Sequence, residues 1–411
     1  MKRHHCRAAS VASQAFFVVL ILVVLCGAAQ AQTFSVIHTF SGPDGRTPVA
    51  GPTLDKYGDL YGTTWGGGAG NYGTLYKLTP VNGSWLLNEV YNFTGLSDGG
   101  LVNGGVTIGP DGTLFGTTEF ANGGSDAGTL YNVKPGGKLC MGGVCQWTDT
   151  TLHTFAGGSD GATPVVNVVF DSHGNLYGTT YYGGTYNDGT VFKGTLSGGT
   201  WNVSVIYTFG APGDGVYPWA PVIVDSAGNL YGTTEIGGPN GYGTVFELSP
   251  SQGGWTETIL HSFSGSDGCL VGAGVVFDGA GNLYGATGYC PTIFEMTPQG
   301  GGWNFTTLYT FPGTGPYHGP SSSLAVDSAG NLYGTTENDG AYGYGNVFEM
   351  SPSSGGWTYT DLYDFTGGND GSQPYGSVVV TGPGGFVYGT TLTGGANGDG
   401  VIFQINLGTQ R

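Results

Sequence analysis

The segment Gly228-Asn-Leu-Tyr-Gly-Thr-Thr234 decides the fold, because seven versions of it occur along the chain. They span residues 58–64, 112–118, 174–180, 228–234, 281–287, 330–336 and 385–391. The central aromatic residues of successive copies lie 54, 62, 54, 53, 49 and 55 positions apart. A period of this length is typical of one blade of a β-propeller.

Each repeat contains four strand-like runs. In the fourth repeat they are residues 221–225, 230–234, 244–248 and 255–263, and turns rich in Gly, Pro, Asn and Ser separate them. Short β-branched and aromatic runs with such turns indicate a meander of antiparallel strands. The sequence therefore predicts seven blades of four strands.

The two ends of the repeat array indicate how it closes. Residues 33–40 match a fourth strand with nothing before it, and residues 400–406 match a third strand with no fourth after it. We therefore expect an all-β fold in residues 32–411, a single seven-bladed β-propeller with four-stranded antiparallel blades, whose N-terminal strand completes the last blade. Closure removes open sheet edges. An open β-solenoid, the alternative, needs capping units and leaves the one-strand offset unexplained.

Composition excludes other architectures and several partners. Of 411 residues, 83 are Gly and only 9% are charged, against averages of about 7% and 25%. The glycines have no three-residue period, which excludes collagen, and 13% aromatic residues argue against disorder. Beyond residue 31 there are 28 acidic and 7 basic residues. This balance disfavours nucleic acid and anionic membranes, and leaves cations, neutral sugars and neutral peptides as partners.

Residues 1–31 have the pattern of a signal peptide. A basic start is followed by the apolar run 15–25 and by Ala29-Gln30-Ala31, an A-x-A cleavage site. We expect cleavage near Ala31 and a secreted chain, extracellular or periplasmic, without membrane insertion and monomeric. Lipidation at Cys26 is the alternative, but Leu25 precedes it where a small residue is needed.

Four cysteines remain in the exported chain. An even count in an oxidising compartment indicates two disulfides. The short gap favours Cys140–Cys145 as a hairpin bridge, which leaves Cys269–Cys290. A metal site is the alternative, but neither pair has C-x-x-C spacing.

The repeats resemble the Gloeo/Verruco (GloVer) tandem-repeat family. The resemblance rests on Gly-Asn-Leu-Tyr-Gly-Thr-Thr, a Gly-Gly loop, Gly-Thr-Val-Phe-Glu-Leu-Ser-Pro and Gly-Gly-Trp, and it covers nearly the whole chain after residue 31. It implies an exported bacterial propeller-like protein. It implies no activity, and it provides no catalytic residues to transfer.

Six of the seven connections that lead into a blade carry Asp-Gly. The aspartates are Asp44, Asp98, Asp160, Asp214, Asp267 and Asp370. Asp-Gly is a turn signal, and its side chain satisfies local backbone N–H groups, so a role in the fold is the simpler interpretation. A ring of carboxylates that collects a cation such as Ca²⁺ is the alternative; otherwise no cofactor is expected. The histidines His38, His153 and His261 replace fourth-strand tyrosines and are interpreted as packing variants.

Positions at which the repeats differ are the better candidates for function. After the Thr-Thr pair the seven repeats place Trp65, Glu119, Tyr181, Glu235, Gly288, Glu337 and Leu392. Aromatic rings and carboxylates on one rim suit stacking on sugars and hydrogen bonding to hydroxyl groups. The predicted ligand-binding residues are Trp65, Tyr181, Tyr217, Trp219 and Tyr317.

Three functions remain open from the sequence. The first is a non-catalytic scaffold that binds a neutral or cationic ligand, such as a polysaccharide or cell-surface glycan, on one face of the ring. The second is a lyase or glycosidase that uses Glu119, Glu235 or Glu337 with His318, since paired carboxylates perform glycoside chemistry. The third is a structural envelope protein. No G-x-S-x-G elbow, H-E-x-x-H motif or phosphate loop is present.

Overall fold

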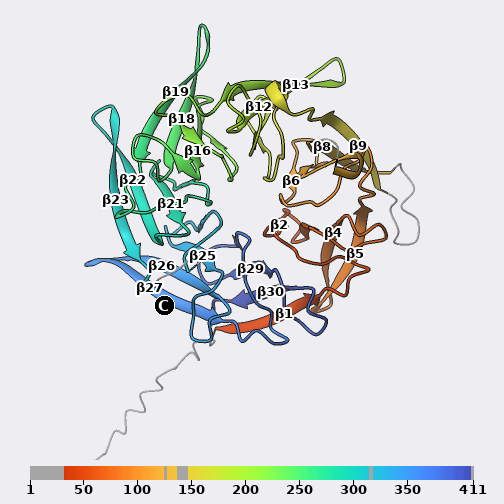
Figure 1. The fold of residues 1–411 in the computed structure, drawn as a ribbon. Helices are drawn as coiled ribbons and strands as arrows, with labels where there is room; N and C mark the ends of the chain where they lie inside the picture. Colours follow the sequence, from red (N-terminus) through yellow and green to blue (C-terminus); the bar gives the residue numbers. More distant parts are fainter. Residues whose placement is uncertain (1–31, 125–126, 137–146, 314–317, 409–411) are drawn as a thin grey trace, which may run out of the picture.

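A computed structural model describes residues 32–124, 127–136, 147–313 and 318–408, which form a closed ring of seven β-sheets (Figure 1). Each sheet has four antiparallel strands, and in the last one the N-terminal strand β1 (Thr33–Thr39) pairs with β30 (Val401–Asn406). The predicted seven-bladed β-propeller, closed by its N-terminal strand, is therefore confirmed. Across the described ranges, no helix is long and apolar enough to cross a bilayer.

The blades are numbered along the chain, and their strands follow one another from the axis outward (Figure 1). Blade 1 comprises β2 (Thr53–Leu54), β3 (Leu60–Thr64), β4 (Thr74–Val81) and β5 (Ser84–Asn92). Blade 2 comprises β6 (Thr107–Ile108), β7 (Leu114–Thr118), β8 (Thr129–Pro135) and β9 (Trp147–Thr154). Blade 3 comprises β10 (Val169–Phe170), β11 (Leu176–Thr180), β12 (Thr190–Ser197) and β13 (Thr200–Thr208). Blade 4 comprises β15 (Ile223–Val224), β16 (Leu230–Thr234), β18 (Thr244–Ser251) and β19 (Gly254–Ser262).

Blade 5 comprises β20 (Val276–Phe277), β21 (Leu283–Thr287), β22 (Thr292–Gln299) and β23 (Gly302–Thr310). Blade 6 comprises β24 (Ala325–Val326), β25 (Leu332–Thr336), β26 (Asn346–Ser353) and β27 (Gly356–Asp364). Blade 7 comprises β28 (Val379–Val380), β29 (Phe386–Thr391), β30 and β1. A two-stranded pair, β14 (Gly215–Val216) and β17 (Ile236–Gly237), and two 3₁₀ turns, η1 (Asn122–Gly124) and η2 (Gly158–Asp160), lie in the loops.

The repeated glycine of the second strand is required by close packing within the blade. In blade 4 a Cβ atom on Gly232 would lie 2.6 Å from the ring of Phe246 on the neighbouring strand β18. Phe246 is fully buried between blades 3 and 4. The Gly and the aromatic residue thus form one packing unit, which explains why the repeat contains both.

The turns that follow the innermost strands are held by their aspartates. In blade 4, Oδ1 of Asp225 accepts hydrogen bonds from the backbone N–H groups of Ala227 and Asn229, at 2.8 and 2.9 Å. The same carboxylate accepts bonds from the Asn229 amide and the Tyr231 hydroxyl. The same bond from the Asn N–H to the Asp carboxylate occurs in the other Asp-x-x-Gly-Asn segments, which begin at Asp171, Asp278 and Asp327, so these segments are structural turns. They lie on one face of the ring, called here the bottom face.

Candidate functional site

The top face carries the connections between blades and the loops that join second to third strands. Its Asp-Gly aspartates are engaged with their own turns. Asp267 accepts hydrogen bonds from the backbone N–H of Ser264 at 2.8 Å and from Nε2 of His261 at 2.9 Å. Equivalent contacts hold Asp44, Asp98, Asp160, Asp214 and Asp370. No group of three or more His, Cys, Asp or Glu side chains gathers in the described ranges in a way that would hold a metal ion.

The fourth-strand histidines do more than pack, because each forms a hydrogen bond with a turn aspartate. Nε2 of His38, His153 and His261 bonds to the Asp-Gly carboxylate that follows in the chain. In other blades the hydroxyls of Tyr91, Tyr207 and Tyr363 donate to the same carboxylate oxygen. His and Tyr interchange at this position because each presents a donor at the end of a flat ring.

On the rim, the residues after the Thr-Thr pair form pairs between neighbouring blades. The Trp65 indole N–H of blade 1 donates to Glu119 of blade 2 at 3.3 Å. The Tyr181 hydroxyl of blade 3 donates to Glu235 of blade 4 at 2.8 Å. Burial, together with Glu235, raises the pKa of Tyr181 well above its ordinary value, so this hydroxyl keeps its proton and remains the donor.

Four of the five predicted ligand-binding residues lie in the described ranges, and three of them form one aromatic group. The ring of Tyr181 stacks on Tyr217 at 4.9 Å and meets Trp219 edge to face, also at 4.9 Å. Trp65 lies apart, against Glu119. Tyr317 lies outside the described residues, as do Cys140, Cys145 and residues 1–31.

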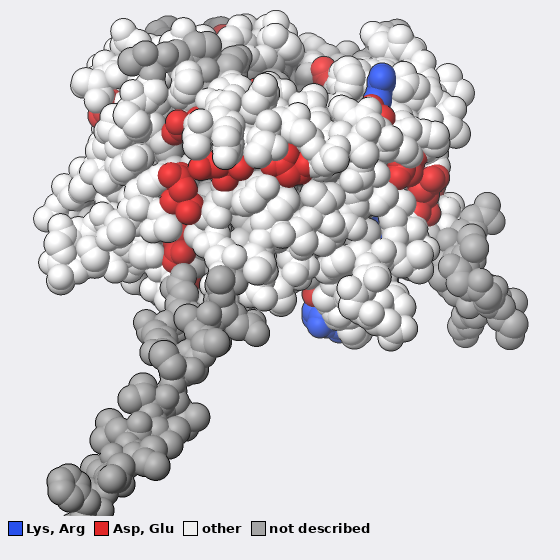
Figure 2. Space-filling view, turned by 90° about the horizontal axis from the view of Figure 1, so that it is seen from below, with Lys and Arg blue, Asp and Glu red and all other residues white. Residues whose placement is uncertain are grey.

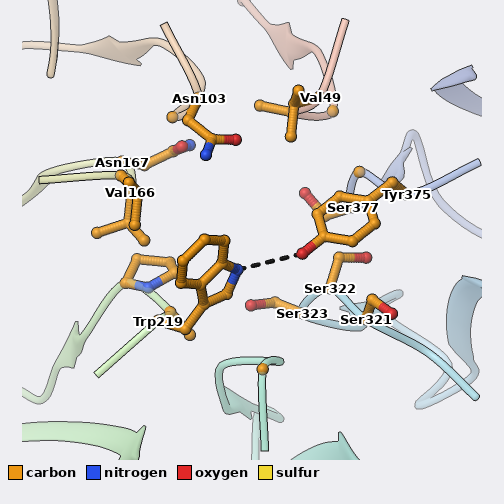
Figure 3. A pocket seen from close by; sticks show the side chains of 18 residues that line it. Val49, Asn103, Val166, Asn167, Trp219, Ser321, Ser322, Ser323, Tyr375 and Ser377 are labelled. Atoms are coloured by element: carbon orange, nitrogen blue, oxygen red, sulfur yellow. Dashed lines mark hydrogen bonds between the residues drawn. The ribbon is translucent and has the colours of Figure 1, made fainter. Parts of the chain in front are cut away.

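The sequence prediction missed Tyr375. Its hydroxyl accepts a hydrogen bond from the indole N–H of Trp219 at 3.2 Å, although the two residues are 156 positions apart (Figure 3). Trp219 and Tyr375 occupy the same repeat position, which is otherwise filled by Val49, Asn103, Val165, Gly272 and Ser321. This variable position beside the axis was detectable by comparing the repeats. The two rings line a small axial cavity of about 100 Å³, together with asparagine, serine and valine side chains (Figure 3).

A larger hollow of about 340 Å³ opens beside Trp219 over blade 5. Its walls include Tyr181, Trp219, Tyr289 and Tyr375, and Glu235 is its one charged residue. The chain has no Lys or Arg between residues 194 and 408. The hollow is therefore aromatic and weakly acidic.

Blade 5 departs from the repeat in three ways, and together these create the hollow. It has Gly272 at the axial position and Gly288 on the rim, where most other blades carry side chains. Its loop between second and third strands is also short: Thr287 and Thr292 are paired five positions apart, whereas Thr234 and Thr244 of blade 4 are ten apart. The missing loop residues leave the space open. They also explain the shortest repeat spacing, 49 residues.

A disulfide between Cys269 and Cys290 fastens this part of blade 5, with a Cα–Cα distance of 5.0 Å. The predicted pairing of these two cysteines is confirmed. Leu270 and Tyr289, the neighbours of the two cysteines in sequence, both line the hollow. The disulfide thus joins two of its walls.

The predicted catalytic residues are not gathered in the hollow. Of the three glutamates only Glu235 lines it, while Glu119 bonds to Trp65 and Glu337 lies on the rim of blade 6. Burial raises the pKa of Glu337. His318 does not line the hollow either; it packs beside Gly313.

Exposed tyrosines extend the aromatic surface around the rim of blades 3 to 6. Tyr182, Tyr186, Tyr242, Tyr289, Tyr342 and Tyr344 are between 41% and 61% exposed. The ring of Tyr344 lies over the backbone of Gly367, and that of Tyr242 lies over Gly265. One face of each ring is thereby supported, and the exposed fraction leaves area for a ligand. Figure 2 shows acidic side chains in a band across the side of the ring and few basic ones.

The fold and this face define the class of protein: a seven-bladed β-propeller with an asymmetric aromatic hollow on its top face. The chain belongs to the Gloeobacter/Verrucomicrobia repeat family, whose model matches residues 27–200, 144–291 and 224–411. No curated protein matches the chain.

Three solved structures show a distant similarity to the chain. A nidogen/laminin complex chain is 14% identical, covering 79% of this chain and 98% of its own, with a TM-score of 0.45. A luciferin-regenerating enzyme is 13% identical, covering 91% and 95%, with a TM-score of 0.44. A PQQ-bound aldose sugar dehydrogenase from Streptomyces coelicolor is 13% identical, covering 91% and 98%, with a TM-score of 0.46. Similarity at this level does not extend to function.

Proposed function

We propose that the protein is an exported, non-catalytic binding protein that holds a neutral or amino-bearing glycan in the hollow over blade 5. The observation that carries this proposal is that four aromatic side chains and one carboxylate line the same hollow. They are Tyr181, Trp219, Tyr289, Tyr375 and Glu235. Aromatic rings present flat apolar faces to the C–H groups of a sugar, and a few polar groups fix its orientation.

The charge around the hollow selects against anionic ligands. Glu235 is its only charged lining residue, and the sequence from 194 to 408 contains no Lys or Arg. A phosphate or carboxylate ligand would meet no cation in this half of the ring, whereas an ammonium group would be attracted by the carboxylate and by the ring faces. A neutral sugar or an amino sugar fits these conditions.

The rim tyrosines favour a glycan chain over a single sugar. Tyr242 and Tyr344 stand in blades 4 and 6, on either side of the hollow. Several weak stacking sites on one rigid surface bind a polymer far more tightly than its monomer, because the later contacts are intramolecular.

Two observations support export. Residues 1–31 have the pattern of a signal peptide. The Cys269–Cys290 disulfide is of a kind that persists in oxidising compartments.

Retention on insoluble cellulose, xylan and chitin particles tests the proposal. We expect wild type to be retained on at least one of them, and Trp219→Ala to reduce retention about tenfold, because it removes the largest ring of the hollow. Tyr57→Ala is the matched control, since Tyr57 is 76% exposed on the bottom face. Equal retention of Trp219→Ala and Tyr57→Ala, or no retention of wild type on any of the three materials, would contradict the proposed function.

A further inference from the structure

At the rim position after the Thr-Thr pair, aromatic residues and glutamates alternate from blade to blade, and this alternation is interrupted at the hollow. An aromatic residue of blade 1 donates to a glutamate of blade 2, and one of blade 3 donates to a glutamate of blade 4. Blade 6 carries the third glutamate, Glu337, at the same repeat position. Blade 5, which should supply its donor, has Gly288 instead.

The absence of an aromatic side chain at Gly288 is accompanied by an open space and by a glutamate without a donor among the described residues. Gly288 lines the hollow. Glu337 accepts no hydrogen bond from any residue of the described ranges, whereas Glu119 and Glu235 each accept one from an aromatic side chain. Glu337 is also partly withdrawn from water, which raises its pKa. The carboxylate of Glu337 therefore has acceptor positions that a ligand donor can use.

Gly288 lines the hollow, and a side chain could leave the backbone there without a clash. A Cβ atom there would lie 3.6 Å from the carbonyl oxygen of Pro320 and from Oγ of Ser321, which are ordinary contact distances. Glu235 already accepts the Tyr181 hydroxyl at 2.8 Å. Glu337 is therefore the rim carboxylate with the greater capacity for a ligand donor.

We infer that the ligand completes the third pair: a pyranose ring occupies the place of the missing aromatic ring beside Gly288, and one of its hydroxyl or ammonium groups donates a hydrogen bond to Glu337. This inference rests on the proposed function and specifies how the sugar is oriented. Trp219 and Tyr289 then flank the sugar, and Glu337 selects the substituent that points toward blade 6.

Two substitutions test the inference on the particles that retain wild type. Gly288→Tyr supplies an internal ring, so we expect it to reduce retention about tenfold or more while the melting temperature stays the same or rises. Gly288→Ala is its matched control and should keep wild-type retention. Glu337→Gln keeps the shape but removes the charge, and we expect about tenfold weaker retention without a loss of thermal stability.

The outcomes separate this inference from the proposed function. If Trp219→Ala weakens retention while Glu337→Gln and a folded Gly288→Tyr do not, the inference is overturned and the binding function stands. If wild type is not retained on cellulose, xylan or chitin, both the proposed function and this inference are contradicted. If Gly288→Tyr loses the wild-type circular dichroism spectrum, Glu337→Gln alone decides: weaker retention supports the inference, and unchanged retention overturns it.

Discussion

The two consecutive threonines, present in six of the seven repeats, serve different interfaces. The first, such as Thr233, donates to a backbone carbonyl of the next blade, here Ala273 at 2.8 Å. The second, Thr234, bonds to Thr244 within its own blade at 2.8 Å. Equivalent bonds to the next blade occur at Thr63, Thr117, Thr179, Thr335 and Thr390. Blade 5 has Ala286 at this position, so its junction with blade 6 lacks the bond.

Restoring that bond should stabilise the ring. We expect Ala286→Thr to raise the free energy of unfolding by about 1 kcal/mol, the typical net value of one buried hydrogen bond. Thr233→Ala should lower it by about 1–3 kcal/mol, because a buried carbonyl loses its donor. Urea unfolding measures both. A destabilised Ala286→Thr would show instead that the junction is too tightly packed for the added atoms.

At the scale of the strand, the junctions between blades differ at one position of the outermost strand, which holds an aromatic ring in some blades and a carboxylate in others. At three junctions a ring stacks on the His or Tyr of the preceding blade, as Phe305 does on His261 at 3.8 Å. In blades 2 and 4 this position holds Asp149 and Glu257 instead. Burial, then the neighbouring aspartate of the Asp-Gly turn, raises the pKa of Asp149 to about 7 and that of Glu257 to about 8.

These carboxyl groups should make stability fall as pH rises. The folded chain holds the Glu257 proton more tightly than the unfolded chain does, so the stabilisation is complete below the usual pKa of 4.5 and is lost as pH rises toward about 8. Glu257→Gln removes this dependence. Between pH 5 and 9, wild type should lose about 1 kcal/mol relative to the variant, after allowance for solvent screening of this half-buried group. Parallel stability curves for the two proteins would refute the assignment.

The disulfide of blade 5 should matter for both stability and binding. Cys269 and Cys290 are 21 positions apart, and removing a cross-link of this length by a Cys269→Ser/Cys290→Ser double variant should cost about 3 kcal/mol. Because Leu270 and Tyr289 line the hollow, we also expect weaker retention on the polysaccharide that binds wild type. Thermal melts and the particle assay measure the two effects. A wild-type melting temperature together with wild-type retention would show that the loops keep their positions without the disulfide.

At the scale of the whole molecule, ring closure depends on one strand. Strand β1 covers β30, and Phe40, which directly follows β1, is fully buried near Tyr76 of blade 1. Deleting residues 33–40 should expose the edge of β30 and open the junction between blades 7 and 1. Open edges pair with other chains. We therefore expect oligomers by size-exclusion chromatography and a lower melting temperature; a monomer that melts like wild type would contradict this role.

Much of the fold was predictable because its determinants are local and repeated. The Gly-Asn-Leu-Tyr-Gly-Thr-Thr segment contains a turn, a strand, a packing glycine and both threonines, and seven copies leave a ring as the simplest closure. The Cys269–Cys290 pairing followed from counting. The role of His38, His153 and His261 did not, because their partners are recognised only when side chains are placed in space.

The sequence by itself determined the seven blades, the strand that closes them and the positions at which the repeats differ. The tertiary structure alone decided which of those positions meet. Trp219 and Tyr375 are three blades apart in the chain yet share a hydrogen bond, because both stand where the seven blades converge on the axis. The hollow likewise exists because a short loop and two glycines occur together in blade 5. Whether missing side chains leave an open space depends on which residues surround them in the folded chain, and the sequence does not show this.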